Sequence, residues 1–329
     1  MIISEEQAVI ILKQDGVVAL PTETVYGLAC NAKSKTAIEQ VYKIKNRPAD
    51  NPLICHFSSM DEILKEVITP ADFVLALMDI LSPGPVSYLL NLKPNSLLRA
   101  ATAGSNKVVA RIPDQENFLR MLSLLDFPLA APSANTSGKV SPTNASMVEY
   151  DLGNKIEGIV DGGNCIIGLE STILDCTNKN KIVILRPGAI GKKEIENLLV
   201  QLELNVTVIE NIISNEVTPG TKYRHYSPVT PVYKINDIHS HSFSANETLI
   251  LVLQQLDEHK HFINELIQKG VMILNLGSLT EMEKIASQLF VNLKMLDEQK
   301  SVAAFMLPID WGTSSIGMAI ANRLSKVIL

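Results

Sequence analysis

The stretch Phe127-Pro-Leu-Ala-Ala-Pro-Ser-Ala-Asn-Thr-Ser-Gly-Lys-Val-Ser-Pro-Thr143 begins as a short apolar strand and continues as a loop of small polar residues. The loop holds hydroxyls, an amide and a turn glycine at a higher density than a simple connection requires. Because short polar side chains let a ligand approach the backbone closely, this composition suits a small ligand that is rich in oxygen atoms.

A second stretch, Pro21-Thr-Glu-Thr-Val-Tyr-Gly27, has the same character and also follows a predicted strand, Val17 to Leu20. Open α/β sheets build their ligand sites in loops at the ends of neighbouring strands. Two ordinary Ser/Thr turns are the structural alternative, and the occurrence of both stretches in one chain favours a site.

Composition limits the classes of protein that fit this chain. Its 329 residues and net charge of −6 predict two domains and disfavour tight nonspecific binding to nucleic acid. No apolar run approaches the roughly eighteen residues that span a bilayer, so we expect no membrane span. The start of the chain lacks a basic segment, so we expect no signal peptide. The four cysteines, without CxxC spacing, favour reduced thiols and a cytoplasmic location.

Alternating helix and strand patterns predict α/β architecture. We expect a first domain over residues 1–204, a linker over 205–230 and a small α/β domain over 231–329. The first domain should begin with a helix capped by Ser4 and Gln7, and a second helix should end before Pro48. The predicted strands are residues 17–20, 53–57, 86–90, 108–112, 129–131, 171–175, 182–186 and 206–213, followed by 231–235, 249–253 and 271–276 in the second domain.

Several common site motifs are absent from the sequence. No two glycines are separated by a single residue, and the chain contains no phosphate-binding Walker loop, no His-Glu-x-x-His and no Gly-x-Ser-x-Gly. The pairs His239/His241 and His259/His261 lie in polar stretches, and we interpret them as solvated side chains rather than metal ligands.

Cations in the remaining polar segments suggest an anionic substrate. Lys43, Lys45 and Arg47 surround a predicted helix C-terminus, where they either complement the helix dipole or clamp a phosphate or carboxylate. Arg111 lies on an apolar strand, where a buried charge needs a partner, and Arg186 ends another strand. Together with the two hydroxyl-rich loops, these arginines predict a site for a substrate that contains phosphate.

The ordered motifs of this chain resemble those of the YrdC-like L-threonylcarbamoyladenylate synthases, in the long form with two domains. The resemblance covers essentially the whole chain and rests on Thr22-Glu-Thr-Val-Tyr-Gly-Leu28, Lys45-Asn-Arg-Pro48, Pro132-Ser-Ala-Asn-Thr-Ser-Gly138 with Ser141-Pro-Thr143, Glu170-Ser-Thr172, Arg186-Pro-Gly188 and Pro219-Gly-Thr-Lys-Tyr-Arg-His-Tyr-Ser-Pro228. It implies a YrdC-like domain with a twisted mixed sheet, followed by a smaller Rossmann-like domain.

The resemblance also implies an activity and roles for single residues. Such an enzyme condenses L-threonine, bicarbonate and ATP into threonylcarbamoyl-AMP and pyrophosphate for tRNA modification. Lys45 and Arg47 would be catalytic. Threonine would meet Thr24, His56, Arg111, Ala131 and Ser171, and ATP would meet Arg47, Asn51, Lys107, Ser133, Asn135, Ser141, Arg186 and His225. Mg²⁺ would accompany ATP without a protein-ligated metal site, and contacts with a downstream transferase and tRNA would be transient.

The chain departs from the family pattern at four positions. Ser82 stands where the family has tryptophan, Ser87 and Lys107 stand where it has threonine, and Thr221 stands where it has methionine. None of these changes removes a charged group, although the change at Lys107 leaves only its main chain as a reliable contact.

The linker is rich in aromatic and basic residues rather than Gly and Ser, so we expect Tyr223 to Tyr226 to fold over ATP as a lid whose far end is anchored by the second domain.

Two other functions are alternatives to this synthase activity. Hydrogenase-maturation carbamoyltransferases share the domain, but they carry zinc fingers and an acylphosphatase domain that this chain lacks. A noncatalytic RNA-binding module is the other alternative, and the acidic charge balance disfavours it.

Overall fold

The computed structural model describes residues 1–210 and 225–329. Contacts divide these residues into two compact units, one of 1–137 and 141–210 and one of 138–140 and 225–329, and each is described by itself. Residues 211–224 of the predicted linker, including Tyr223, lie outside the described residues.

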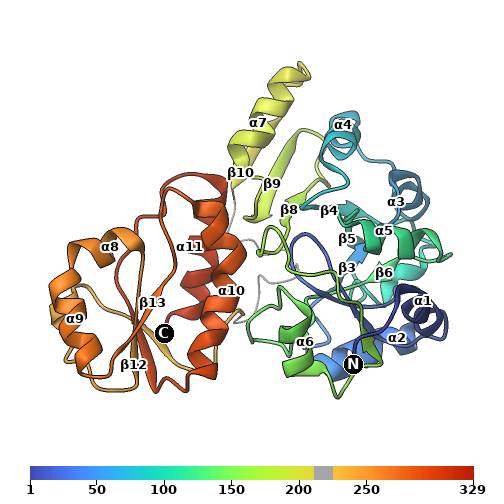
Figure 1. The fold of residues 1–329 in the computed structure, drawn as a ribbon. Helices are drawn as coiled ribbons and strands as arrows, with labels where there is room; N and C mark the ends of the chain where they lie inside the picture. Colours follow the sequence, from blue (N-terminus) through green and yellow to red (C-terminus); the bar gives the residue numbers. More distant parts are fainter. Residues whose placement is uncertain (211–224) are drawn as a thin grey trace. The chain divides into compact units, whose positions relative to one another are not determined.

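The first unit is a mixed sheet with helices packed against it (Figure 1). Its helices are α1 (Glu5–Lys13), α2 (Lys35–Lys45), α3 (Met60–Glu66), α4 (Asp72–Leu81), η1 (Leu97–Arg99), α5 (Glu116–Ser123), α6 (Ala145–Leu152) and α7 (Lys192–Gln201). Its strands are β1 (Val18–Leu20), β2 (Gly27–Asn31), β3 (Ile54–His56), β4 (Val86–Asn91), β5 (Lys107–Arg111), β6 (Leu129–Ala130), β7 (Gly158–Ile159), β8 (Thr172–Asp175), β9 (Lys181–Arg186) and β10 (Thr207–Glu210). The strand order is β10-β9-β8-β4-β5-β3-β6-β2-β1-β7.

Local signals in the sequence explain where the first helices begin and end. Ser4 caps α1, and the side chain of Gln7 completes the predicted capping box. Ser34 caps α2, and Asn46 ends it in the left-handed conformation, which asparagine tolerates well. All seven strands predicted for the first domain are present, and the described part of the strand predicted over 206–213 forms β10, but β2 and β7 were not predicted.

Alternation along the strands gives the sheet two distinct faces. One face carries Cys55, Tyr88, Ala110 and Ile184, which belong to the main hydrophobic core together with residues of α2, α3, α4 and α7. The other face carries a smaller apolar cluster made of Ile54, Leu89, Val109, Ile173 and Leu185. This second face, on strands β3, β5, β4, β8 and β9, is where the candidate site lies.

Helices α1 and α5 cover the second face only beyond β3. Their apolar side chains pack with Val18 and Leu20 of β1, Ala29 of β2 and Leu129 next to β3. The helices also contact one another. Polar side chains that alternate with the small apolar cluster therefore lie beside the edge of this helical layer rather than beneath it.

The second unit is a parallel sheet of four strands with order β11-β14-β12-β13. Its strands are β11 (Val232–Lys234), β12 (Glu247–Leu251), β13 (Met272–Asn275) and β14 (Ala303–Met306), and its helices are η2 (Ile238–Ser240), α8 (Leu253–Glu258), α9 (Lys260–Gln268), α10 (Met282–Glu298) and α11 (Ser315–Val327). The expected Rossmann-like arrangement is confirmed. The sequence prediction missed β14, a run of four residues that includes two alanines, which have low strand propensity.

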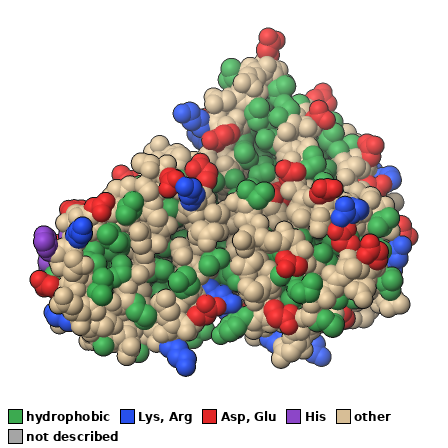
Figure 2. Space-filling view, in the orientation of Figure 1, with side chains coloured by type: hydrophobic (Ala, Val, Ile, Leu, Met, Phe, Trp, Pro, Cys, Tyr) green, Lys and Arg blue, Asp and Glu red, His purple; other side chains and the backbone are tan. Residues whose placement is uncertain are grey.

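The surface of the chain mixes charges of both signs. On the face drawn in Figure 2, lysine and arginine side chains are interspersed with acidic ones and with hydrophobic patches. Among the described residues, no helix has both the length and the hydropathy that a bilayer span requires.

Candidate functional site

Arg111, at the end of β5, is the centre of the predicted site. Its side chain is buried, and its Nε donates to the carbonyl oxygen of Gly84 at 3.2 Å. Its Nη1 donates to the hydroxyl of Thr24 at 2.9 Å, and its Nη2 lies 2.6 Å from Oε2 of Glu23. The partner that a buried strand arginine requires is therefore Glu23, a residue that the sequence analysis did not assign.

The Thr22–Thr24 loop is fixed by its own hydroxyls. The Thr22 hydroxyl donates to the carbonyl oxygen of Val25 at 2.7 Å, and it accepts from the backbone N–H groups of Thr24 and Val25. The hydroxyls of Thr22 and Thr24 also lie 2.7 Å apart, and either can be the donor of that contact. The Thr24 oxygen accepts from Arg111, which fixes that guanidinium from a second side.

His56 lies directly beside Arg111, because the two residues are paired in the parallel register of β3 and β5. Its ring packs 5.3 Å from that of Phe118 on α5, measured between centroids. Burial, and then the positive charge of Arg111, lower the pKa of His56 from 6.5 to about 3. His56 is therefore a neutral imidazole at physiological pH, able to offer one donor and one acceptor.

Lys45, the last residue of α2, is almost completely buried, and its ammonium donates to the carbonyl oxygens of Ser133 and Asn135. The carbonyl oxygen of Lys45 accepts from the backbone of Ser137 at 2.8 Å. Burial, and then repulsion by Arg47, hold the pKa of Lys45 well below its ordinary value. Lys45 thus organises the polar loop with which the sequence analysis began.

Arg47 is tied to the turn that follows α2. Its Nε donates to the carbonyl oxygen of Asn51 at 3.0 Å, while Nη2 donates to Oδ1 of Asn51 at 2.7 Å and to the carbonyl oxygen of Pro52 at 2.8 Å. Arg47 and Asn51, both assigned to ATP by the resemblance, are therefore in direct contact. Because one edge of the guanidinium is engaged with the protein, it is held in a fixed orientation.

Ser171 and Arg186 form a second group on the same face. The hydroxyls of Ser171 and Ser87 lie 2.7 Å apart, joining the loop before β8 to β4. The turn after Arg186 approaches this serine so closely that a Cβ on Gly188 would lie 2.5 Å from the backbone nitrogen of Thr172. Glycine at 188 is therefore required by space rather than by backbone conformation.

The predicted loop residues around Ser141 are also held by specific contacts. The Ser141 hydroxyl donates to Oε1 of buried Glu170 at 2.6 Å. The amide of Asn135 donates to the carbonyl oxygen of Thr136 at 2.9 Å, and the backbone of Ala131 donates to the carbonyl oxygen of Ile54 at 2.9 Å. Ala131 is thereby attached to the strand that carries His56.

Lys107 lies apart from these groups. Lys107 begins β5, whereas Arg111 ends it, so four strand steps of about 3.3 Å separate their backbones. His225 belongs to the second unit, where its ring lies 5.5 Å from that of Tyr226.

Tyr226 is the last residue of the predicted lid. It is buried in the second unit, where its ring stacks on Phe290 and meets Arg323 and Lys326 at 5.6 Å. The described end of the predicted lid is therefore an anchor on α10 and α11, and aromatic composition alone could not distinguish a buried anchor from a ligand contact.

The carboxylates Glu23 and Glu170 are the site residues that the sequence analysis missed. Both lie inside quoted motifs, next to Thr24 and Ser171. The signal that points to Glu23 is Arg111, a lone arginine on an apolar strand. The sequence analysis predicted that Arg111 needs a partner but did not name that partner.

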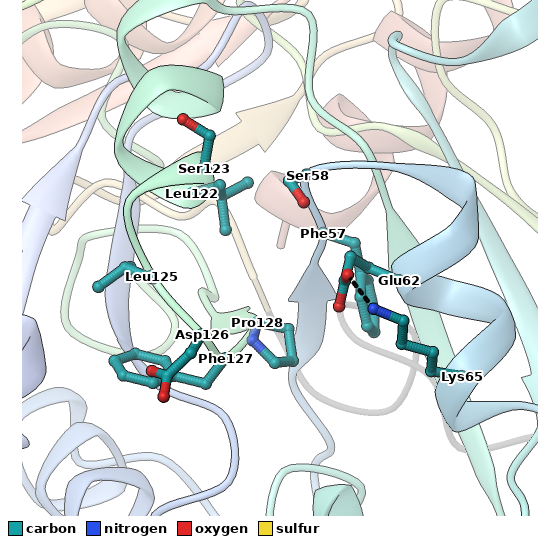
Figure 3. Close-up of a pocket in the computed structure, with 10 residues that line it drawn as sticks. All are labelled: Phe57, Ser58, Glu62, Lys65, Leu122, Ser123, Leu125, Asp126, Phe127 and Pro128. Carbon is teal, nitrogen blue, oxygen red and sulfur yellow. Dashed lines mark hydrogen bonds and ion pairs between the residues drawn. The ribbon is translucent and has the colours of Figure 1, made fainter.

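A separate hollow of about 400 Å³ lies past the end of β3 (Figure 3). Phe57 and Ser58 line it together with Glu62 and Lys65 of α3 and residues 122–128, and Glu62 and Lys65 pair with one another. Its lining includes none of the site residues that were predicted from the sequence.

Comparison with known families finds two matches that together span nearly the whole chain. Residues 10–188 match the Sua5–YciO–YrdC family, which is described as "Telomere recombination". Residues 190–327 match the family described as "Threonylcarbamoyl-AMP synthase, C-terminal domain".

Individual relatives match over nearly their full length. The threonylcarbamoyl-AMP synthase of Bacillus subtilis is 37% identical over 97% of this chain and 91% of the relative, and that of Pyrococcus abyssi is 35% identical over 96% and 91%. The crystal structure of P. abyssi Sua5 complexed with L-threonine superposes with a TM-score of 0.81 at 31% identity, covering 99% of this chain and 95% of that one.

Proposed function

We propose that this chain, which belongs to the Sua5–YciO–YrdC family, is a threonylcarbamoyl-AMP synthase that uses L-threonine, bicarbonate and ATP. The observation that carries the proposal is the buried polar network around Arg111, where Glu23, Thr24 and neutral His56 meet at the edge of the helical layer. A network of this kind suits the binding of a small polar substrate rather than covalent catalysis by a protein nucleophile.

Threonine would bind at this network. Arg111 would bind the α-carboxylate with the N–H groups that Gly84 and Thr24 leave unused. His56 lies next to Arg111 in the sheet, and the Ala131 main chain is bound to the strand that carries His56; both would contact the hydroxyl and amine of the same substrate. Ser171 would complete the site from the loop before β8.

ATP would bind along the cationic side of the face. Arg47 and Arg186 would contact phosphate oxygens, with Asn51, Ser133, Asn135 and Ser141 as neutral partners. Lys45 would direct its remaining N–H to the bicarbonate or phosphate oxygens. The remaining proposed contacts of ATP are Lys107, at the far end of β5, and His225, in the second unit.

The chemistry needs positioning and charge neutralisation more than covalent catalysis. The threonine amine attacks bicarbonate, and water leaves to give the carbamate. A carbamate oxygen then attacks the α-phosphorus of ATP, and pyrophosphate leaves. Fixed guanidinium and ammonium groups stabilise the negative charge that accumulates in the second step.

Mg²⁺ would arrive with ATP, because phosphate oxygens supply most of the ligands that this ion prefers. The described part of the chain contains no group of three or more His, Cys, Asp or Glu side chains that could hold a metal. We further propose a cytoplasmic location and transient transfer of the product to the enzyme that modifies tRNA.

Pyrophosphate release tests this function. We expect release with all three substrates and Mg²⁺, and loss of release when either threonine or bicarbonate is omitted. Equal release without threonine would contradict the proposal and indicate a different nucleotide-hydrolysing activity.

A further inference from the structure

Glu23 and Arg111 form a buried ion pair in which hydrogen-bonding groups of both side chains remain unmatched. Their nearest atoms are 2.6 Å apart and both side chains are buried, at 6% and 4% exposure. Neither carboxylate oxygen of Glu23 makes a hydrogen bond of acceptable geometry with the described residues, and the same holds for Nη2 of Arg111. Leaving such charged groups unsatisfied is costly, so their geometry indicates a missing ligand.

The groups around the pair leave its net charge near zero. His56 is neutral because burial lowers its pKa to about 3. Burial also keeps Cys165, which interacts with both Glu23 and Arg111, a neutral thiol by raising its pKa to about 12. The positive charge of Arg111 is thus balanced by Glu23, so this part of the face does not favour an anion as a bare arginine would.

We infer that Glu23 determines specificity for a zwitterion, binding the α-ammonium of the amino acid whose α-carboxylate binds Arg111. A zwitterion supplies an ammonium with N–H donors for the unsatisfied carboxylate and an acceptor for the unsatisfied guanidinium. A carboxylic acid without an amine would instead place a second negative charge beside Glu23. The inference rests on the proposed function and adds a residue that rejects such anions.

The test compares L-threonine with β-hydroxybutyrate, which has the same carbon chain, hydroxyl and carboxylate but no amine. Calorimetry gives the Kd of threonine, and competition with threonine gives that of β-hydroxybutyrate. Glu23→Gln keeps the shape of the side chain and removes its charge. We expect this variant to bind threonine about tenfold to a hundredfold more weakly and to bind β-hydroxybutyrate no more weakly than the unmodified protein does.

Two further variants separate specificity from folding. Glu23→Asp keeps the charge, and we expect it to keep the preference for threonine even if both ligands bind more weakly. Glu66→Gln is the matched control, because Glu66 is also ion-paired, 3.1 Å from Lys33, and accepts from Ser96 at 2.6 Å. It should leave both dissociation constants unchanged, and thermal unfolding checks that each variant is folded.

Parallel weakening of both ligands in Glu23→Gln would overturn the inference, because Glu23 would then only orient Arg111. An unchanged preference in that variant, or a lost preference in folded Glu23→Asp, would overturn it as well. These outcomes are distinct from failure of the proposed function, which is measured as pyrophosphate release by the unmodified protein.

Discussion

Arg186 binds Ser171 at two points, with Nε donating to the carbonyl oxygen at 2.9 Å and Nη2 donating to the hydroxyl at 3.0 Å. The arginine thereby fixes both the backbone and the side chain of the serine. Because the serine hydroxyl also meets Ser87, the three residues connect β9, β8 and β4 on the site face. A change at Arg186 should therefore act on the threonine and phosphate parts of the site together.

Arg186→Lys should lose about a hundredfold in kcat/KM, since an ammonium cannot reproduce a planar fork that reaches two acceptors. Steady-state pyrophosphate release at varied threonine and varied ATP measures the effect on each substrate. Lys181→Met, a change at the exposed start of the same strand, is the control and should be silent. Near-normal activity of Arg186→Lys would show that the two-point contact is not needed.

Lys45→Met should abolish synthase activity and lower the free energy of unfolding by about 1–3 kcal/mol, because it leaves the carbonyl oxygens of Ser133 and Asn135 without their donor. Urea unfolding followed by circular dichroism measures the stability. Lys43→Met, two residues away on α2, should change neither quantity. If Lys45 serves only as a charge for phosphate, activity should fall with no loss of stability.

The strands that carry the site were predictable because their apolar residues recur in short runs bounded by turn residues. The hydroxyl loops were predictable because their composition exceeds what a turn needs. The same patterns could not reveal β2 and β7, since Gly27–Asn31 continues directly from a polar loop and Gly158–Ile159 is only two residues long. Strand order on the sheet, which places His56 beside Arg111, depends on long-range pairing that periodicity does not encode.

The sequence predicts which residues belong to the site better than it predicts the hydrogen-bond partner of each residue. The sequence indicated that Arg111 and Lys45 belong to the site, but it did not indicate that Lys45 also donates to two backbone carbonyls. A charged side chain in a loop offers several partners at similar cost, and only tertiary packing selects among them. The burial of Tyr226 was unpredictable for the same reason, because its neighbours on α10 and α11 are more than sixty residues away in the chain.

Arg47→Ala should lose about a hundredfold or more in rate, which corresponds to roughly 3 kcal/mol of transition-state stabilisation. Arg47→Lys should also be poor, because Asn51 and Pro52 accept three N–H···O bonds from one guanidinium. Single-turnover kinetics with saturating ATP separates the chemical step from binding. If Arg47 only stabilises the end of α2, both variants should retain turnover and show a slightly lower Tm.

His56 should make stability depend on acidity. Its folded-state pKa of about 3 lies below the unfolded value of 6.5, so the unfolded chain binds the extra proton between these values. Stability from this residue is complete above pH 6.5 and decreases as the pH falls toward 3, by up to about 1.4 kcal/mol per pH unit. Urea unfolding at pH 7, 6 and 5 measures the slope, and His56→Gln should reduce it. An identical slope in His56→Gln would contradict the prediction.

Tyr226→Ala should destabilise the second unit by about 3–5 kcal/mol, the usual cost of removing a buried aromatic side chain. The ring stacks on Phe290 at 5.5 Å and meets two cations of α11. Trp311, the only tryptophan of the chain, is buried in the same unit, so its fluorescence during urea unfolding reports on that unit directly.

The matched control for this variant is Tyr233→Ala, because Tyr233 also stacks on a phenylalanine, Phe305, yet is 41% exposed. Its effect should be well under half that of Tyr226→Ala, since less apolar surface returns to water. The two variants remove the same atoms, so a difference between them reports on burial and on the cations of α11. Equal urea midpoints for the two variants would mean that Tyr226 does not anchor this end of the linker. That result would favour the lid role that the sequence suggests for this residue.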